Sequence, residues 1–368
     1  EKLALEGSYI DLPYVVKGMD FSFSGLLSAA LRAYKRGEKI EDVCYSLQET
    51  AFAMLVEVTE RALAHTGKNE VMLCGGVSAN SHLREMMKTM ADEHFAEFYC
   101  PEMKFSGDNG VMIAWLGHLM YETYGPLKLE DTHIIQRFRT DEVDAPWVDN
   151  TVSRIELPEE LLAKGAESDI YRADWLGMPA IVKHRLPKSY RIEEIDEKIR
   201  RHRTKSEAKI LSDVKRAGVR APVLYDVDLK NKDIIMEDIP GPMIKDVMPD
   251  LTQEKRKDLA VAIGETIRSF HDVDIIHGDL TGSNMILVDD NVDDIKNNLA
   301  VFDFGLGRYS DLLEDKAVDL LVLKKSFQSV DYEIASETFD WILDAYDSDS
   351  SKMRDKISEI QSRGRYTH

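Results

Sequence analysis

The sequence IIHGDLTGSNMIL at residues 275–287, followed by VFDFGLG at 301–307, decides the fold of the second part of the chain. Asp279 is placed to orient a hydroxyl group and accept its proton, and Asn284, five residues on, can bind a metal ion through its amide oxygen. Asp303 follows an apolar strand pattern and can hold Mg²⁺ against the phosphates of ATP. The 24 positions from Asp279 to Asp303 leave room for a β-hairpin. This ordered set predicts a phosphoryl-transfer site.

Two further features lie upstream of these motifs. Lys183 ends the strand pattern PAIVK, where its ammonium can reach the α- and β-phosphates of ATP, and Glu207 can hold that lysine in an ion pair. The sequence LAKGAESDIY at 162–171 stands where a glycine-rich loop would cover the phosphates, although it keeps a single glycine. Its backbone N–H groups and Ser168 must then do the work of the missing glycines. The predicted ATP contacts here are Leu162, Ala163, Lys164, Gly165, Ala166, Glu167, Ser168, Asp169 and Ile170.

The segments around these motifs predict a β-rich lobe followed by a helical lobe, which is an α+β order. Strand patterns and one charged helix come first, and longer helices follow. The strands are expected at 169–175, 179–183, 223–228 and 233–236, and the charged helix at 192–214. We therefore place a small bilobal domain at 161–368, with an N-lobe at about 161–240 and a C-lobe at about 241–368.

The first part of the chain alternates helices with short strands, as α/β layered domains do. A long helical pattern covers 47–63, and a buried strand at 70–74 leads into a helix at 78–90. The helix at 111–121 is apolar nearly all round, which predicts that it is buried. Since 125–157 has no sustained periodicity, we place this domain at 1–148 and a linker at 149–160.

The loop CGGVSAN at 74–80 sits between the predicted strand and helix. Gly75 and Gly76 allow a ligand to approach the backbone, the helix N-terminus offers N–H groups to an anion, and Asn80 can hydrogen-bond a ribose, phosphate or amide. A tight turn without a ligand explains the same residues. Asp108 precedes the apolar helix, where it fits an N-cap or can reach into a cleft and bind a metal.

The length and the net charge of the chain limit the classes of protein to which it can belong. A chain of 368 residues suggests two domains, and no apolar run reaches the roughly 18 residues of a membrane helix. The net charge of −20 does not indicate nucleic-acid binding. The exception is 183–209, where ten Lys or Arg face five acids and RRHRTK occupies 200–205. That stretch predicts either a phosphate-binding patch or a solvated helix face with i,i+4 ion pairs.

The second domain resembles the protein-kinase superfamily, and its differences from most kinases indicate which subgroup it resembles. Gly278 stands in the catalytic loop where most kinases have Arg, and no APE motif lies between Asp303 and Asp319. Over about 160–366 the domain resembles the PRPK-like atypical kinase of the KEOPS complex. The segments that carry this resemblance are IVKHRLPKSYR, RTKSEAKIL, HGDLTGSN, DFGLGR and a terminal RGRY. The resemblance implies a Mg-ATP-dependent Ser/Thr kinase or ATPase that regulates its complex. It also implies that Asp279 is catalytic, that Asn284 and Asp303 bind Mg²⁺, and that Arg363 and Arg365 contact tRNA.

The first domain resembles the second half of the TsaD/OSGEP family, through GGVSAN, GDNGVMIA and MDFSFSGLLSAA. That resemblance implies the actin-like ATPase (ASKHA) fold and threonylcarbamoyl transfer from threonylcarbamoyl-AMP to adenosine 37 of ANN-decoding tRNAs. Gly75, Gly76, Asn80 and Glu1 would then bind the adenylate, and Asp108 would bind Fe²⁺ or Zn²⁺. No two histidines lie four residues apart, so the family's HxxxH metal ligands are missing and we expect them outside this chain.

Together these resemblances predict an archaeal-type fusion of a tRNA threonylcarbamoyltransferase with its KEOPS kinase. It would be cytoplasmic, free of the membrane, and bound to tRNA and the other KEOPS subunits, with contact between its own two domains. Two alternatives stay open: a stand-alone atypical Ser/Thr protein kinase, and a nucleotide-binding scaffold without turnover.

Overall fold

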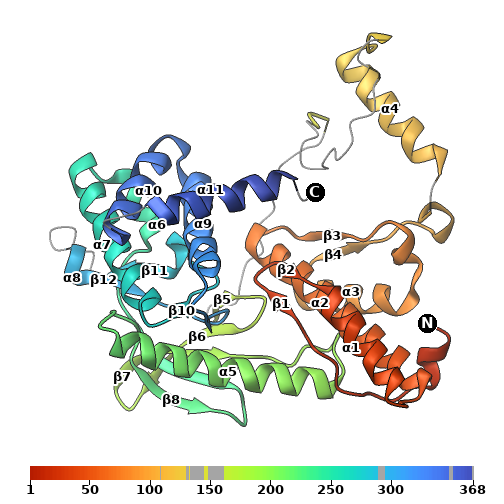
Figure 1. Cartoon of the computed structure of the whole chain (residues 1–368), viewed down its shortest axis with the longest axis horizontal. Helices are drawn as coiled ribbons and strands as arrows, with labels where there is room; N and C mark the ends of the chain where they lie inside the picture. The colour runs from red at the N-terminus through yellow and green to blue at the C-terminus, as the bar shows by residue number, and fades with distance from the viewer. Residues whose placement is uncertain are drawn as a thin grey trace.

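The computed structural model describes residues 1–107, 109–129, 132, 145–147, 161–288, 295–347 and 351–366. Figure 1 shows two bodies: residues up to Tyr124 lie on one side, and residues from Leu161 onward form the rest, with α5 running beneath both. The predicted linker at 149–160 lies outside the described residues.

The first body is built around one long helix, α2 (Ile40–Thr66). Two hydrophobic clusters pack on α2, one around Met54 and one around Val56. The strands β3 (Glu70–Met72) and β4 (Glu97–Tyr99) pair in parallel. The remaining elements are η1 (Leu3–Glu6), β1 (Val16–Lys17), β2 (Asp20–Phe21), α1 (Phe23–Lys35), η2 (Gly76–Ala79), α3 (Ser81–Glu93), η3 (Met103–Phe105) and α4 (Gly110–Tyr124). Alternating helices and strands were predicted here and are confirmed.

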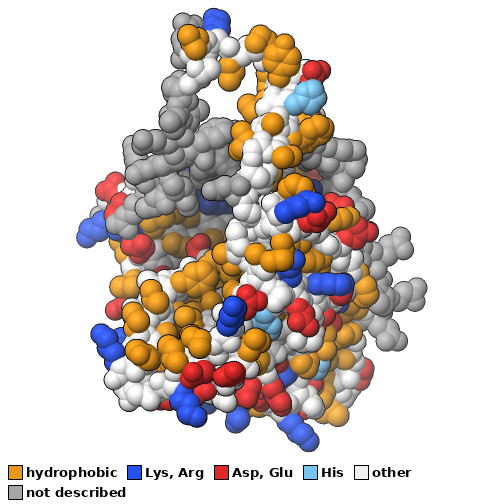
Figure 2. Space-filling model, turned by 90° about the vertical axis from the view of Figure 1, so that its right-hand side faces the viewer, with side chains coloured by type: hydrophobic (Ala, Val, Ile, Leu, Met, Phe, Trp, Pro, Cys, Tyr) orange, Lys and Arg blue, Asp and Glu red, His pale blue; other side chains and the backbone are white. Residues whose placement is uncertain are grey.

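Two predictions of burial in this body are wrong. In β3 only Val71 is buried, and Met72 is 70% exposed. Helix α4 buries none of its residues; it projects away from the body in Figure 1, and Figure 2 shows hydrophobic side chains along it. An apolar pattern shows that a helix has no polar face, but it does not show whether a partner covers it.

The second body begins with an antiparallel sheet of five strands in the order β5-β6-β7-β9-β8. Helix α5 (Glu193–Arg216) packs against its β8 and β9 strands. The strand bounds are β5 (Leu161–Lys164), β6 (Asp169–Trp175), β7 (Met178–His184), β8 (Leu224–Asp228) and β9 (Asp233–Glu237). The four strands and the charged helix predicted from the sequence are confirmed.

The helical lobe follows, and its core is continuous with that of the sheet. Gly264 on α7 (Gln253–His271) lets α10 (Tyr332–Tyr346) approach closely, because a Cβ at this position would lie 2.5 Å from the carbonyl oxygen of Ile342. The predicted hairpin is present as β11 (Met285–Leu287) and β12 (Leu299–Val301). The other elements are α6 (Ile244–Val247), η6 (Met248–Asp250), β10 (Ile275–Ile276), η7 (Gly282–Asn284), α8 (Ile295–Asn298), β13 (Arg308–Tyr309), α9 (Leu313–Val330) and α11 (Ser351–Tyr366).

The segment after β7 joins the two bodies. Tyr190 is buried in a hydrophobic cluster that otherwise belongs to the first body, and its hydroxyl donates to Glu60 of α2 at 2.6 Å. Lys188 also pairs with Glu60 at 2.5 Å, and the Ser189 hydroxyl donates to Glu93 of α3. The two bodies therefore share one buried interface.

Candidate functional site

The predicted lysine and its two carboxylates meet in the second body. Lys183, near the end of β7, places Nζ 2.8 Å from Glu207 Oε1 on α5 and 2.5 Å from Asp303 Oδ1. Burial disfavours the charge on Lys183, but Asp303 and Glu207 raise its pKa above the usual value. Burial would likewise raise the pKa of Asp303, yet Lys183 holds it below its usual range. Lys183 and Asp303 are therefore both charged at neutral pH, which suits binding of phosphate and of a metal ion.

Asp303 has a backbone conformation that supports a role at this site. Its φ is +60°, in the left-handed region that residues other than glycine rarely adopt. Its Oδ1 accepts the backbone N–H of Gly305 at 3.2 Å as well as the Lys183 ammonium. Such strain persists only where the surroundings fix it, and it concentrates at functional sites.

Arg185 is a neighbour of this site that the sequence analysis missed. It is 1% exposed, and its Nη2 donates to the second oxygen of Glu207 at 2.5 Å. Glu207 thus holds two cations, one through each oxygen. The alternation of β7 was a usable signal, because residues 183 and 185 lie on the same face of an extended chain.

The catalytic loop brings Asp279 and Asn284 together. Asn284 Nδ2 donates to the backbone oxygen of Asp279 at 2.8 Å and to its Oδ2 at 3.1 Å. Since the amide nitrogen faces Asp279, the amide oxygen is the atom of Asn284 able to bind a cation. Asp303 and Asn284 then supply two oxygen ligands, which fits Mg²⁺ because this ion completes its shell with water and substrate phosphates.

Asp319 shapes the same loop from α9, and the sequence analysis gave it no role. It is buried, and its carboxylate accepts the backbone N–H groups of His277 at 2.6 Å and Gly278 at 2.8 Å. The His277 ring packs on Phe304, with ring centroids 4.5 Å apart. A single aspartate 42 positions from His277 carries no local sequence signal.

The predicted nucleotide loop forms the turn between β5 and β6. Gly165 N–H donates to the Ser168 carbonyl at 3.0 Å, and the side chains of Ser168 and Asp169 are buried. Two side chains in this turn face the first body instead. Lys164 donates to the Glu93 backbone, and Glu167 pairs with Arg61 and with Arg203, the latter at 2.9 Å. At Lys164 and Glu167, the predicted contact with ATP is therefore left to the backbone, because both side chains are engaged elsewhere.

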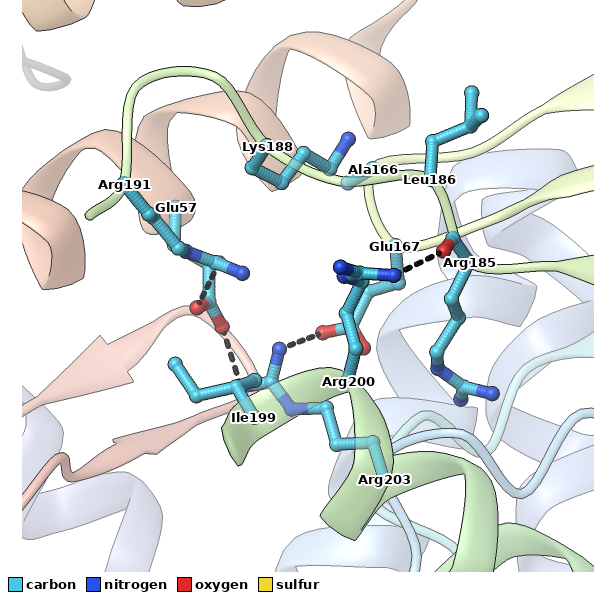
Figure 3. A pocket seen from close by; sticks show the side chains of 10 residues that line it. All are labelled: Glu57, Ala166, Glu167, Arg185, Leu186, Lys188, Arg191, Ile199, Arg200 and Arg203. Carbon is cyan, nitrogen blue, oxygen red and sulfur yellow. Dashed lines mark hydrogen bonds and ion pairs between the residues drawn. The ribbon is translucent and has the colours of Figure 1, made fainter. Parts of the chain in front are cut away.

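The buried charges between the bodies centre on Glu57 of α2. Its oxygens accept Arg61 at 2.6 Å. They also accept Arg191 at 2.5 Å and Arg203 at 2.7 Å, as Figure 3 shows. Burial alone would raise the pKa of Glu57, but Arg203, Arg191 and Arg61 lower it. Arg203 joins Glu57 to Glu167 of the nucleotide turn, as Figure 3 shows.

This arrangement shows that Arg200 and Arg203 do not form a free basic patch in the stretch RRHRTK. Arg203 is enclosed by Glu57 and Glu167, and Arg200 pairs with Asp196 one turn away at 2.6 Å. Arg201 remains exposed. The alternative of i,i+4 pairs on a helix holds for Arg200, whereas Arg203 belongs to the interface. The side chains of Arg363 and Arg365 lie outside the described residues.

The glycine loop of the first body also brings predicted residues together. Gly75 has φ +90°, and its carbonyl accepts the Ser78 hydroxyl at 2.6 Å. Asn80 caps α3, because its Oδ1 accepts the N–H of Leu83 at 3.1 Å. Glu1 lies beside this turn, where its Oε1 accepts the Ser81 hydroxyl at 2.9 Å. Gly75, Gly76, Asn80 and Glu1 thus gather at one exposed helix N-terminus.

The predicted metal ligand Asp108 lies outside the described residues. Asn109 caps α4, accepting the N–H of Met112 at 3.0 Å. Within the described ranges, no three His, Cys, Asp or Glu side chains gather in a way that could hold a metal ion.

Comparisons with known proteins agree with this division. The sequence model of TsaD, tRNA N6-adenosine threonylcarbamoyltransferase, matches residues 1–115, and that of RIO1, the RIO domain, matches residues 182–295. Three similar relatives each carry the name "probable bifunctional tRNA threonylcarbamoyladenosine biosynthesis protein". They come from Methanobrevibacter smithii, Methanothermobacter thermautotrophicus and Methanocaldococcus jannaschii, and are 64%, 53% and 47% identical to this chain. This chain belongs to that family.

The alignments to the three relatives cover the whole of this chain and 66%, 67% and 67% of the relatives. The chain thus spans about two thirds of their length. Among solved structures, WaaP in complex with acyl carrier protein matches with a TM-score of 0.42 and 13% identity, over 56% of this chain and 89% of that one. Across the part of the chain that the structure describes, no helix is both long and apolar enough to cross a membrane.

Proposed function

We propose that the second body is a PRPK-like kinase or ATPase that uses Mg-ATP. The observation that supports this is the contact of Lys183 with both Glu207 and Asp303 in one ion-paired group. Lys183 would bind the α- and β-phosphates, and Asp303 with Asn284 would hold Mg²⁺, which would neutralise the charge on the transferred phosphate. Asp279 would orient the acceptor, either a protein hydroxyl or water, and accept its proton.

The test is phosphate transfer from ATP labelled at the γ-phosphate, measured with and without tRNA. Asp279→Asn should abolish both labelled protein and released phosphate. Asp311→Asn is the matched control, because Asp311 is an exposed acid of the same lobe with no ion pair among the described residues. If neither wild type nor control turns over while ATP still binds, the domain is a nucleotide-binding scaffold. Transfer to a protein hydroxyl that ignores tRNA would favour a stand-alone kinase.

We further propose that the whole protein acts in threonylcarbamoyladenosine formation on ANN-decoding tRNAs, as a KEOPS component. The first body would correspond to the later part of the transferase's actin-like fold. Its loop 75–80, together with Glu1, would bind threonylcarbamoyl-AMP, since a helix N-terminus with glycines before it offers N–H groups to the phosphate. The family relationship and the gathering of Glu1 with Asn80 support this role.

Asn80 allows a sharp test, because capping and ligand binding can be separated there. Asn80→Ser keeps a side-chain oxygen able to cap α3 but removes the amide. AMP, which carries the adenylate part of the substrate, should bind this variant more weakly than wild type while the melting temperature stays close to that of wild type. Equal affinity for AMP in both proteins would remove Asn80 from the site.

A further inference from the structure

A cavity of about 480 Å³ lies between the two bodies and reaches Gly305, whose backbone N–H donates to Asp303. Its walls come from the N-terminal segment 9–18, from α2, from α5 and from the segment 305–308. Lys183, Asp279, Asn284 and Asp303 do not line it. Its size lies within the range of roughly 300–1,000 Å³ typical of small-molecule sites, which often form between domains.

The lining of the cavity contains no acidic residue, which is unusual in so acidic a chain. Its 19 residues include no aspartate or glutamate, although 67 of the 368 residues of the chain are acidic, so about three would be expected by chance. The basic residues on the wall are Lys17, Arg61, Lys198, His202, Arg203 and Arg308. A cleft lined by one sign of charge concentrates ligands of the opposite sign.

Two of these basic residues have side chains available to a ligand. The side chains of Lys17 and His202 are exposed and make no hydrogen bond or ion pair with other described residues. The others have acidic partners that stand outside the lining: Glu57 and Glu167 pair with Arg61 and Arg203, Asp11 with Lys198, and Asp315 with Arg308. Lys17 comes from the first body and His202 from α5, so a ligand between them would touch both bodies.

Unsatisfied polar atoms on the same wall are a second, independent sign. Thr50 Oγ1, Arg61 Nε and Arg308 Nε are buried and have no hydrogen-bond partner among the described residues. Thr50 and Arg61 are 1% and 5% exposed. Leaving a buried donor unpaired is costly, so native proteins normally supply it with a partner. All three atoms can donate, and the side chains that carry them line one cavity.

We infer that this cavity binds a small phosphate-bearing anion, either free pyrophosphate or the phosphates of a nucleotide. Phosphate suits the wall better than a single carboxylate, because it presents several acceptor oxygens to cations on two sides. Gly18 also lets a ligand approach the backbone, because the nearest atom to a Cβ at this position would be 3.9 Å away. A small ligand fits a space of about 480 Å³ better than an RNA backbone does.

The test is calorimetric titration of the full chain with pyrophosphate at low salt. The variant with Lys17→Gln and His202→Gln removes the two available basic side chains, and we expect it to bind pyrophosphate about tenfold more weakly or worse. Lys205→Gln is the matched control: it lies on the same helix, is exposed, has no ion pair among the described residues, and does not line the cavity. It should bind within about twofold of wild type.

Two further arms separate this cavity from other sites. Lys183→Met should weaken Mg-ATP binding but leave pyrophosphate binding unchanged, and the double variant should show the reverse. Comparing AMP with inorganic phosphate distinguishes a nucleotide from a free anion. Equal pyrophosphate affinity in wild type and double variant overturns the inference. So does loss of pyrophosphate binding in Lys183→Met, or a double-variant defect seen only with a single-stranded oligonucleotide.

Discussion

Replacement of Glu57 by Gln tests the buried interface directly. The side chain of Glu57 is 2% exposed, and its two oxygens serve Arg61, Arg191 and Arg203 within 2.7 Å, with the Tyr14 hydroxyl at 2.5 Å. Gln keeps the shape and one acceptor oxygen but removes the charge that these guanidinium groups share. Removing one partner of a buried ion pair costs about 3–5 kcal/mol, because the opposite charge stays buried and unpaired. We expect a loss of that size in the free energy of unfolding.

The same interface supplies the control. Lys198 and Asp11 also join the two bodies, with Nζ and Oδ1 2.6 Å apart, but their side chains are 60% and 67% exposed. Lys198→Gln should therefore cost only about 0.2–1 kcal/mol, the usual value of a surface ion pair. Urea denaturation at pH 7, followed by circular dichroism, compares both variants with wild type.

Two outcomes decide the question. If Glu57→Gln costs no more than Lys198→Gln, burial does not strengthen this network and the reasoning is wrong. If Glu57→Gln does not fold, Tyr14→Phe replaces it, since that change removes one hydrogen bond to Glu57 and leaves the charges in place. Tyr14→Phe should cost about 1–3 kcal/mol, the value of a hydrogen bond to a charged group.

Three other outcomes are expected. The pKa values of Glu57 and Glu60 are lowered in the folded chain, so their stabilisation is complete above the ordinary carboxylate pKa of about 4.5 and is lost as the pH falls toward the lowered values. Urea denaturation should show this loss as a decline in the free energy of unfolding below about pH 4.5. Gly264→Ala should cost at least about 1–3 kcal/mol, whereas Gly117→Ala on α4, where a Cβ meets nothing within 4 Å, should be neutral or stabilising; thermal melts compare them. Asp303→Asn should lose the Mg²⁺ dependence of nucleotide binding without unfolding, and unchanged Mg-ATP titration would contradict its role.

The sequence predicted which residues of the proposed nucleotide site would meet, because they lie at the ends of regular elements. Lys183 near the end of a strand and Glu207 in the following helix meet as expected. The hairpin between Asp279 and Asp303 also forms as expected. Arg185 was missed although the alternation of β7 places it on the same face as Lys183. Asp319 was missed because a single buried acid carries no motif, and its role follows only from its contact with the backbone of the predicted catalytic loop.

The interface could not be predicted, because its partners lie far apart along the chain. Arg203 and Glu57 are 146 residues apart, and Glu167 and Arg61 are 106 apart. A count of charges over residues 183–209 includes neither Glu57 nor Glu167, so its ten basic residues were interpreted as a surface patch. The error at α4 has the same origin: its apolar pattern was read correctly, but burial depends on a second surface that the pattern does not contain.

Helix α5 connects the proposed nucleotide site, whose contacts were predicted from the sequence, to the interface between the two bodies, which was not predicted. Glu207 and Arg203 lie one turn apart on this helix. Glu207 holds Lys183 of the nucleotide site, and Arg203 holds Glu57 of the first body together with Glu167 of the nucleotide turn. A rigid helix cannot move one of these contacts without moving the other. The position of α2 in the first body therefore bears on the geometry of both Lys183 and the turn expected to cover ATP.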